Sequence, residues 1–197
     1  MSTKVPGRQA ELQQPAKVVL DAEALERTLS RIAHEIIERN DDLDSVALVG
    51  IRTRGVPIAE RLAELIEERS GTEVALGAVD ITFKRDDRDP DLAHPIVGAT
   101  DLHFSLAGTT CILVDDVLYT GRTIRAAIET LFAHGRPARV QLAVLVDRGH
   151  RELPIRPDYV GKNLPTARSE RIQVQLVETD GADRILLLNV PEEESRA

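Results

Sequence analysis

Residues 111–123 read CILVDDVLYTGRT, and the architecture of the whole chain can be worked out from this segment. Its first four residues are an apolar run that leads directly into two carboxylates, Asp115 and Asp116. A turn with two threonines and a glycine follows. Behind the turn, apolar residues recur three and four positions apart, which predicts an amphipathic helix; they are Ile124, Ala127, Ile128, Leu131 and Phe132. The segment therefore predicts a buried strand, a polar turn and a helix, in that order.

Strands and helices alternate on both sides of this segment. Asp21 is a predicted N-cap, and the helix behind it has one apolar stripe, made of Leu25, Leu29, Ile32 and Ile36. Pro57 suits the first turn of another helix, and Gly71 its end. We expect helices over residues 22–40, 58–69 and 124–134, and strands over residues 46–49, 74–81, 111–114 and 140–146. Such alternation indicates an α/β domain with a mostly parallel sheet and helices on its faces.

Two parts of the chain fall outside this alternation. Residues 82–108 are polar and irregular, which is typical of a functional or mobile segment. Near the end, two apolar runs, residues 172–177 and 184–189, flank Asp180-Gly181, a pattern that predicts a small β-hairpin or hood. We expect a flexible arm over residues 1–16, a single domain over residues 17–190 and an acidic tail over residues 191–197.

The composition restricts the class of protein. The chain has 197 residues, of which 42% are hydrophobic and 29% charged, as in an ordinary globular domain. Cys111 is the single cysteine, so an intrachain disulfide and a cysteine-based zinc site are excluded. No apolar run approaches the about 18–20 residues that span a bilayer, and we expect a cytoplasmic protein. The formal net charge of −8 disfavours indiscriminate binding to nucleic acids.

The turn after Asp116 has the features of a phosphate site. Ligands of open parallel sheets bind beyond the carboxyl ends of the strands, and a helix N-terminus offers unpaired N–H groups to a phosphate. Gly121 lets the backbone approach closely, and the hydroxyls of Thr120 and Thr123 can donate further hydrogen bonds. Two carboxylates beside a phosphate need hydroxyls or a cation as partners, which a ribose 5-phosphate with Mg²⁺ supplies. Neither GxxxxGK[ST] nor GxGxxG follows a predicted strand.

Residues 111–123 resemble the motif that binds phosphoribosyl diphosphate (PRPP) in type I phosphoribosyltransferases. Four further stretches resemble one family of this fold, the bifunctional pyrimidine operon regulators and uracil phosphoribosyltransferases (PyrR family); they are residues 30–40, 48–55, 80–87 and 142–163. The resemblance extends from about residue 18 to residue 177. It implies the type I phosphoribosyltransferase fold.

The resemblance also implies which residues bind substrate. Asp115 and Asp116 would bind the ribose hydroxyls and residues 120–123 the 5-phosphate, while Thr53 and Arg54 would contact the leaving diphosphate. Arg85 resembles an active-site lid arginine. The implied catalytic residues are Arg54, Arg85, Asp115 and Asp116. The implied substrate-binding residues are Thr53, Arg54, Arg85, Asp115, Asp116, Val117, Leu118, Tyr119, Thr120, Gly121, Arg122, Thr123, Asp147 and Arg148.

In this family uracil and PRPP give UMP and diphosphate. Mg²⁺ would be bound mainly through PRPP, with Asp115 and Asp116 as candidate direct ligands. The family also binds a stem-loop in the leader of the pyrimidine operon messenger RNA in response to uridine nucleotides, and so attenuates transcription. The resemblance implies that RNA would face Ser30, Arg31, His34, Arg39, Thr53, His150, Arg151, Arg156 and Lys162. It further implies a homodimer or homotetramer.

Charge patterning agrees with a confined RNA surface. At 100° per residue, Arg27, Arg31 and His34 share the helix face opposite the apolar stripe. Residues 148–171 carry six Lys or Arg against three Asp or Glu, a local net charge of +3. Two alternatives stay open at this point: a phosphoribosyltransferase with a catalytic role only, acting on uracil or another base, and a nucleotide-sensing regulator without catalysis.

Overall fold

The computed structural model describes residues 17–81 and 100–189. The predicted arm over residues 1–16, the tail over residues 191–197 and Arg85 lie outside the described residues. The first half holds β1 (Lys17–Leu20), α1 (Ala22–Arg39), the short 3₁₀-helix η1 (Leu43–Ser45), β2 (Val46–Ile51), α2 (Gly55–Ser70) and β3 (Ala75–Val79). The second half holds β4 (Asp101–Leu102), β5 (Thr110–Leu118), α3 (Arg122–His134), β6 (Arg139–Asp147), β7 (Tyr159–Asn163), β8 (Glu170–Gln175), α4 (Val177–Asp180) and β9 (Arg184–Asn189).

The predicted parallel sheet is present. Six strands lie in the order β4-β3-β2-β5-β6-β7, and every pair is parallel except β3 with β4. β2 and β5 are adjacent, with Val49 opposite Leu113. All residues of β2 are buried, as expected of a strand that is covered on both faces. The carboxyl ends of β2 and β5 therefore open at the same edge of the sheet.

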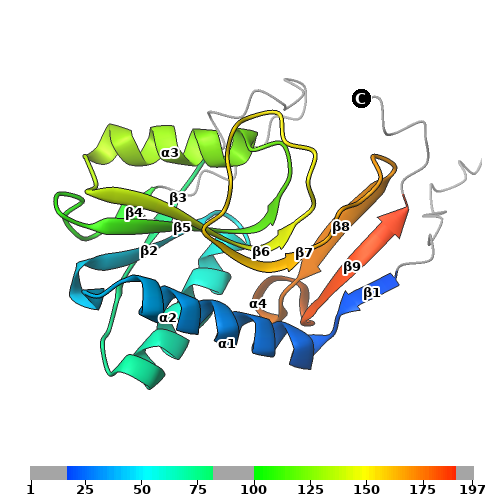
Figure 1. Cartoon of the computed structure of the whole chain (residues 1–197), viewed down its shortest axis with the longest axis horizontal. Helices are drawn as coiled ribbons and strands as arrows, with labels where there is room; N and C mark the ends of the chain where they lie inside the picture. The colour runs from blue at the N-terminus through cyan, green and yellow to red at the C-terminus, as the bar shows by residue number, and fades with distance from the viewer. Residues whose placement is uncertain (1–16, 82–99, 190–197) are drawn as a thin grey trace, which may run out of the picture.

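Helices cover both faces of this sheet (Figure 1), α3 on one face and α1 with α2 on the other. The stripe of α1 is buried as predicted. The Asp21 carboxylate caps the helix by accepting a hydrogen bond of 2.9 Å from the Ala24 N–H. α2 starts earlier than predicted, at Gly55, and its C-cap Gly71 is left-handed with φ +73°. Within the described residues, no helix is long and apolar enough to cross a membrane.

A second, antiparallel sheet forms the hood, in the order β1-β9-β8 (Figure 1). The predicted pairing of the two C-terminal runs is correct, but the tight turn at Asp180-Gly181 is wrong. A short helix, α4, occupies residues 177–180 instead, and Gly181 is its left-handed C-cap. The Asp180 carboxylate accepts from the Leu176 N–H at 3.1 Å, so this aspartate closes a helical turn rather than a hairpin.

Three further features differ from the expectation. β5 continues through Asp115 and Asp116 to Leu118, so both carboxylates belong to the strand. β7 and β1 were not expected as strands, and β4 interrupts the segment predicted to be irregular. The hood is not a separate body, because buried residues of β8 and β9 belong to the same apolar cluster as those of α1, α2 and β2.

Candidate active site

A cavity of about 670 Å³ opens at the carboxyl ends of β2 and β5. The β2–α2 connection, the end of β5, the N-terminus of α3 and strand β8 of the hood all line it. Of the predicted substrate-binding residues that the structure describes, all but Asp147 line this cavity. The structure therefore brings the two most widely separated parts of the prediction, around Arg54 and around Asp116, to one place.

The two carboxylates are held by the strand that carries them. Asp115 is 7% exposed, and its Oδ1 accepts from the Asp116 N–H at 3.0 Å. Asp116 Oδ1 accepts from the Val117 N–H at 2.7 Å. Burial raises the pKa of Asp116, while these hydrogen bonds and the nearby Arg54 guanidinium oppose that rise. A ligand that offers hydroxyl donors or a cation to these carboxylates would relieve their desolvation.

The phosphate-loop prediction places residues 120–123 at the start of α3, and the structure agrees. Gly121 is the N-cap, with φ +94°, a left-handed conformation that L-residues rarely adopt. Its carbonyl accepts the first helical hydrogen bond, from the Arg125 N–H at 3.0 Å. The Thr120 carbonyl accepts from the backbone N–H groups of Glu152 and Leu153. These hydrogen bonds hold the loop of residues 120–123 to the loop after β6, while the N-terminus of α3 lines the cavity. A helix N-terminus in such a position suits a phosphate.

Arg54 lies at the other side of the cavity, directly before α2. Arg52 and Thr53 precede it, are exposed, and are joined by a cis peptide bond. The Arg54 guanidinium is about one third exposed and pairs with Asp180 of α4, with Nη2 2.8 Å from Oδ1. This contact raises the pKa of Arg54, and the charge of Asp116 raises it further. Arg54 is therefore a fixed cation between the carboxylates of β5 and the hood.

Tyr119 and Arg148 form a stacked pair at the cavity. The Arg148 guanidinium carbon lies 4.0 Å from the Tyr119 ring centroid. Arg148 itself is buried, and it donates to Thr166 Oγ1 at 3.0 Å and to the Glu170 carbonyl at 2.8 Å. Arg148 thus packs against one face of the exposed Tyr119 ring. The sequence predicted that both residues bind substrate, but it did not predict that their side chains stack.

Asp147 does not reach the cavity. Its carboxylate accepts from Arg151 Nη2 at 2.5 Å and from the Gly149 N–H at 3.0 Å. Cys111, expected in the core, is fully buried in β5, and burial raises the pKa of its thiol to about 11. A thiol with so high a pKa and no exposure is a poor nucleophile.

Sequence reasoning missed several cavity residues. Strand β8 contributes most of them, and Glu152 comes from the loop after β6; the full set is Ile81, Ile124, Glu152, Arg171, Ile172, Gln173 and Val174. Arg52 also lines the cavity but was expected only as part of the loop before α2. β8 lies far from the motif in sequence, and only the packing of the hood brings it to the cavity.

The similarities to known proteins agree with this geometry. A model described as "Phosphoribosyl transferase domain" matches residues 15–179. A "Bifunctional protein PyrR" of Deinococcus radiodurans is 55% identical over 175 residues, which cover 89% of this chain and 96% of that protein. The protein with the same name in Chloroflexus aurantiacus is 56% identical over 172 residues, 87% of this chain and 94% of that protein.

The chain belongs to the PyrR family. More distant solved structures share the fold of this PyrR family member. The hypoxanthine phosphoribosyltransferase of Trypanosoma cruzi, in complex with the product IMP, matches with a TM-score of 0.67 at 17% identity, over 91% of this chain and 92% of that one. A hypoxanthine phosphoribosyltransferase of Staphylococcus aureus gives a TM-score of 0.64 at 17% identity, over 90% and 94% of the two chains. The α/β fold with its hood is therefore that of type I phosphoribosyltransferases.

Most residues that the PyrR resemblance assigned to RNA lie along α1 and β7. Arg31 donates to the carbonyls of Val160 and Gly161 at 2.9 and 2.6 Å, and Arg39 donates to the Asp158 carbonyl at 2.7 Å. Lys162 of β7 is half-buried, and Arg156, in the loop before β7, is exposed. We call the surface made by Ser30, Arg31, His34, Arg39 and Lys162 the α1–β7 face.

The α1–β7 face is less basic than its list of residues indicates. Arg31 pairs with Glu35, and His34 lies 3.3 Å from Glu38, in each case one helical turn away. Ser30 accepts from Arg69 of α2 at 2.6 Å. The positive charge that remains for a partner of this PyrR family member is therefore concentrated on few side chains.

The other assigned residues lie at the cavity edge. Thr53 lines the cavity itself. His150 is exposed, with φ +59°, and its ring meets that of Tyr119 edge-on at 5.9 Å. Arg151 donates to the carbonyls of Tyr119 at 2.7 Å and Ile155 at 3.0 Å, as well as to Asp147. In this PyrR family member, Arg151 thus links the loop after β6 to the backbone directly before residues 120–123.

Proposed function

We propose that this chain is a uracil phosphoribosyltransferase and an RNA-binding regulator of pyrimidine operon transcription. It transfers the ribosyl 5-phosphate group of PRPP to N1 of uracil and releases diphosphate. One observation carries the catalytic part: Asp115, Asp116, the loop of residues 120–123 and Arg54 line a single cavity.

Each group has a role that its position supports. The N-terminus of α3, with the hydroxyls of Thr120 and Thr123, binds the 5-phosphate. Asp115 and Asp116 accept hydrogen bonds from the ribose hydroxyls. The bond between the anomeric carbon and the diphosphate oxygen breaks as N1 of uracil attacks, and positive charge develops on the ribose ring. N1 gives up its proton to solvent as the new bond forms. The carboxylates stabilise that charge and Arg54 stabilises the leaving diphosphate, contributions that increase in the transition state.

Mg²⁺ fits this site as a companion of the substrate. Among residues 17–81 and 100–189, no group of three or more His, Cys, Asp or Glu side chains could hold a metal alone. A cation bound chiefly by the oxygens of PRPP needs few protein ligands, and Asp115 and Asp116 would face it. When bound, Mg²⁺ supplies positive charge to the diphosphate as it leaves.

Two variants test the catalytic assignment. Asp116→Asn and Arg54→Ala should each lower kcat/KM for UMP formation by about 10²–10³-fold, because each removes charge that stabilises the transition state. Initial rates with uracil, PRPP and Mg²⁺ measure the effect, and thermal melting followed by circular dichroism shows that the variants fold. Wild-type rates in both variants would contradict the assignment.

A panel of bases separates the enzyme classes. Uracil, orotate, hypoxanthine and adenine are each supplied with PRPP, and we expect turnover with uracil. Turnover with a purine alone would indicate a transferase for another base. The absence of turnover with every base would indicate a nucleotide-sensing regulator without catalysis.

The regulatory function uses the nine residues assigned to RNA in the sequence analysis, with the α1–β7 face as the main surface. Single-stranded RNA loops are recognised through base edges and arginine stacking, so a small set of cations suffices. Uridine nucleotides in the cavity would promote binding. We further propose that the protein works in the cytoplasm as a homodimer or homotetramer, which would present one copy of the α1–β7 face per protomer.

Filter binding of a pyrimidine-leader transcript, with and without UMP and over a range of salt, tests this function. Arg156 is exposed and is one of the nine residues assigned to RNA, so Arg156→Ala should weaken binding and reduce its salt dependence. Arg139, an exposed arginine at the opposite end of the sheet, provides the matched control as Arg139→Ala. Equal affinities in all three proteins, or no binding at low salt, would leave the enzyme without the regulator.

A further inference from the structure

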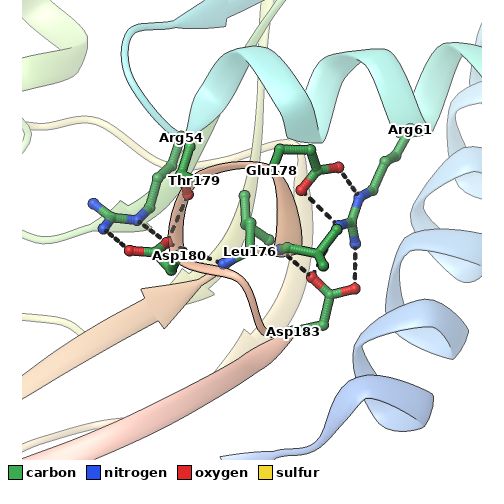
Figure 2. A network of polar contacts seen from close by, with 8 residues as sticks. Arg54, Arg61, Leu176, Glu178, Thr179, Asp180 and Asp183 are labelled. Carbon is green, nitrogen blue, oxygen red and sulfur yellow. Dashed lines mark hydrogen bonds and ion pairs between the residues drawn. The ribbon is translucent and has the colours of Figure 1, made fainter.

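The hood is joined to α2 by two arginines, Arg54 at the N-cap of that helix and Arg61 within it (Figure 2). Arg54 and Arg61 are seven residues apart, about two helical turns. Arg61 pairs with Glu178 and Asp183, its Nη2 lying 2.7 Å from Glu178 Oε2 and 2.8 Å from Asp183 Oδ1. Arg54 pairs with Asp180, which lies between those two acids. Three carboxylates of one short segment therefore meet two guanidinium groups, one at the N-cap of α2 and one within the helix.

The two arginines differ in their position relative to the cavity. Arg61 does not line the cavity, so its contacts only fasten the segment of residues 177–183 to α2. Arg54 does line the cavity and lies within electrostatic reach of Asp116. The contact with Asp180 thus reaches directly into the candidate active site.

Asp180 is fixed independently of Arg54. Its Oδ2 accepts from the Leu176 N–H at 3.1 Å and from the Thr179 hydroxyl at 2.6 Å (Figure 2). Its side chain is 18% exposed, and the contact with Arg54 lowers its pKa to about 2. The carboxylate is therefore a rigid, charged support whose own position does not depend on a ligand.

The contact uses one edge of the guanidinium. Nη2 donates to Oδ1 at 2.8 Å, and Nε lies 3.3 Å from Oδ2. A guanidinium has five N–H donors in a rigid plane, so fixing one edge fixes the direction of the donors that remain. Those donors are the ones that an anion in the cavity can meet.

We propose that Asp180 is the positioning residue of the diphosphate site: it holds the Arg54 guanidinium in the orientation that binds diphosphate, and thereby makes the hood part of that site. This inference rests on the proposed function. It assigns to a residue of α4, outside the cavity lining, a specific effect on one substrate.

A positioning role and a purely electrostatic role predict opposite changes in diphosphate affinity when Asp180 is replaced by Asn. Asp180→Asn removes a negative charge near a polyanion site, and by charge alone this would tighten diphosphate binding. A positioning residue gives the opposite sign, because the freed guanidinium must be ordered when the anion binds. The Asn side chain keeps an oxygen that can accept from the Leu176 N–H, so the turn of α4 is preserved.

The experiment measures binding of magnesium diphosphate to the full-length chain by calorimetry, together with the KM values for PRPP and uracil. We expect Asp180→Asn to raise the Kd for diphosphate and the KM for PRPP about tenfold, with the KM for uracil unchanged within about twofold. Asp183→Asn is the matched control: it loosens the same segment at Arg61, so its Kd should stay at the wild-type value.

A double variant completes the test. If Asp180 acts through Arg54, Asp180→Asn adds no further loss to Arg54→Ala. Tighter binding in Asp180→Asn, unchanged binding, or an equal loss in Asp183→Asn would each overturn the inference. If Arg54→Ala binds diphosphate as wild type does, Arg54 does not bind diphosphate and the inference is also overturned. A wild-type chain that turns over no base with PRPP would instead contradict the proposed function.

Discussion

Gly55 lies where the two halves of the candidate site meet. A Cβ atom at this position would lie 2.2 Å from the carbonyl oxygen of Val114, far inside contact distance. Gly55 follows Arg54, and Val114 precedes Asp115. The missing side chain therefore lets the Arg54 side and the Asp115–Asp116 side of the cavity approach each other.

We predict that Gly55→Ala separates α2 from β5. The expected loss of unfolding free energy is about 1–3 kcal/mol, since the added methyl group overpacks a backbone contact. The KM for PRPP should rise as well, because Arg54 moves with α2. Urea denaturation and steady-state kinetics measure the two effects. Gly71→Ala, at an open left-handed C-cap, is the control that should lose stability without a change in KM.

The Asp21 carboxylate caps the N-terminus of α1. We predict that Asp21→Ala lowers the unfolding free energy by about 1 kcal/mol, because the Ala24 N–H loses its acceptor. Urea denaturation of the variant measures this loss. Asp41→Ala, an exposed change beyond the other end of α1, should have no measurable effect; equal losses in the two variants would show that the cap contributes nothing.

The segment around α4 should respond to acid. The pKa values of Asp180, Glu178 and Asp183 are all lowered by their arginine partners, that of Asp180 from 3.8 to about 2. A carboxylate with a lowered pKa stabilises the fold above its ordinary pKa and loses that contribution as the pH falls toward the lowered value. The stability difference between wild type and Asp180→Asn should therefore be constant above about pH 5 and shrink toward pH 2. Urea midpoints at pH 7, 5 and 3 measure it, and a difference that grows in acid would contradict it.

The elements that the sequence predicts well are those whose pattern is local. The stripe of α1 and the apolar run of β5 each show their buried face within one segment. β7 is not predicted because its sequence, YVGKN, has neither an apolar run nor an alternating apolar pattern. The Asp180-Gly181 dipeptide is typical of a hairpin, yet the Asp180 carboxylate accepts from the Leu176 N–H one helical turn earlier and from Arg54, which lies 126 residues away in sequence. No local pattern connects Asp180 to Arg54.

The difference between local patterns and long-range contacts also applies to the candidate site. Asp115, Asp116 and residues 120–123 belong to one contiguous motif, and all of them line the cavity. Their roles in binding substrate stay predictions. The β8 residues that close the cavity reach it only because the hood packs on the main core. Arg85, predicted in the lid, lies outside the described residues, so its role stays a prediction.

Hood and main sheet share one apolar cluster, so we expect the whole molecule to unfold in a single transition. A ligand that binds only the folded chain shifts that transition, by about 2.7 kcal/mol at a hundred times its Kd. UMP should therefore raise the urea midpoint of the wild type, as followed by circular dichroism, and should have little effect on Asp116→Asn. Two separate transitions, or an equal UMP shift in both proteins, would contradict this picture.

The contacts between α1 and β7 have a consequence for genetics. Arg31 and Arg39 donate to backbone carbonyls of residues 158–161, so they hold the fold together as well as facing outward. A screen for alleles that lose repression would recover changes at these two positions whether they damage RNA recognition or simply reduce protein abundance. Arg156, which is exposed and also assigned to RNA, is the position from which a separation-of-function allele is best sought.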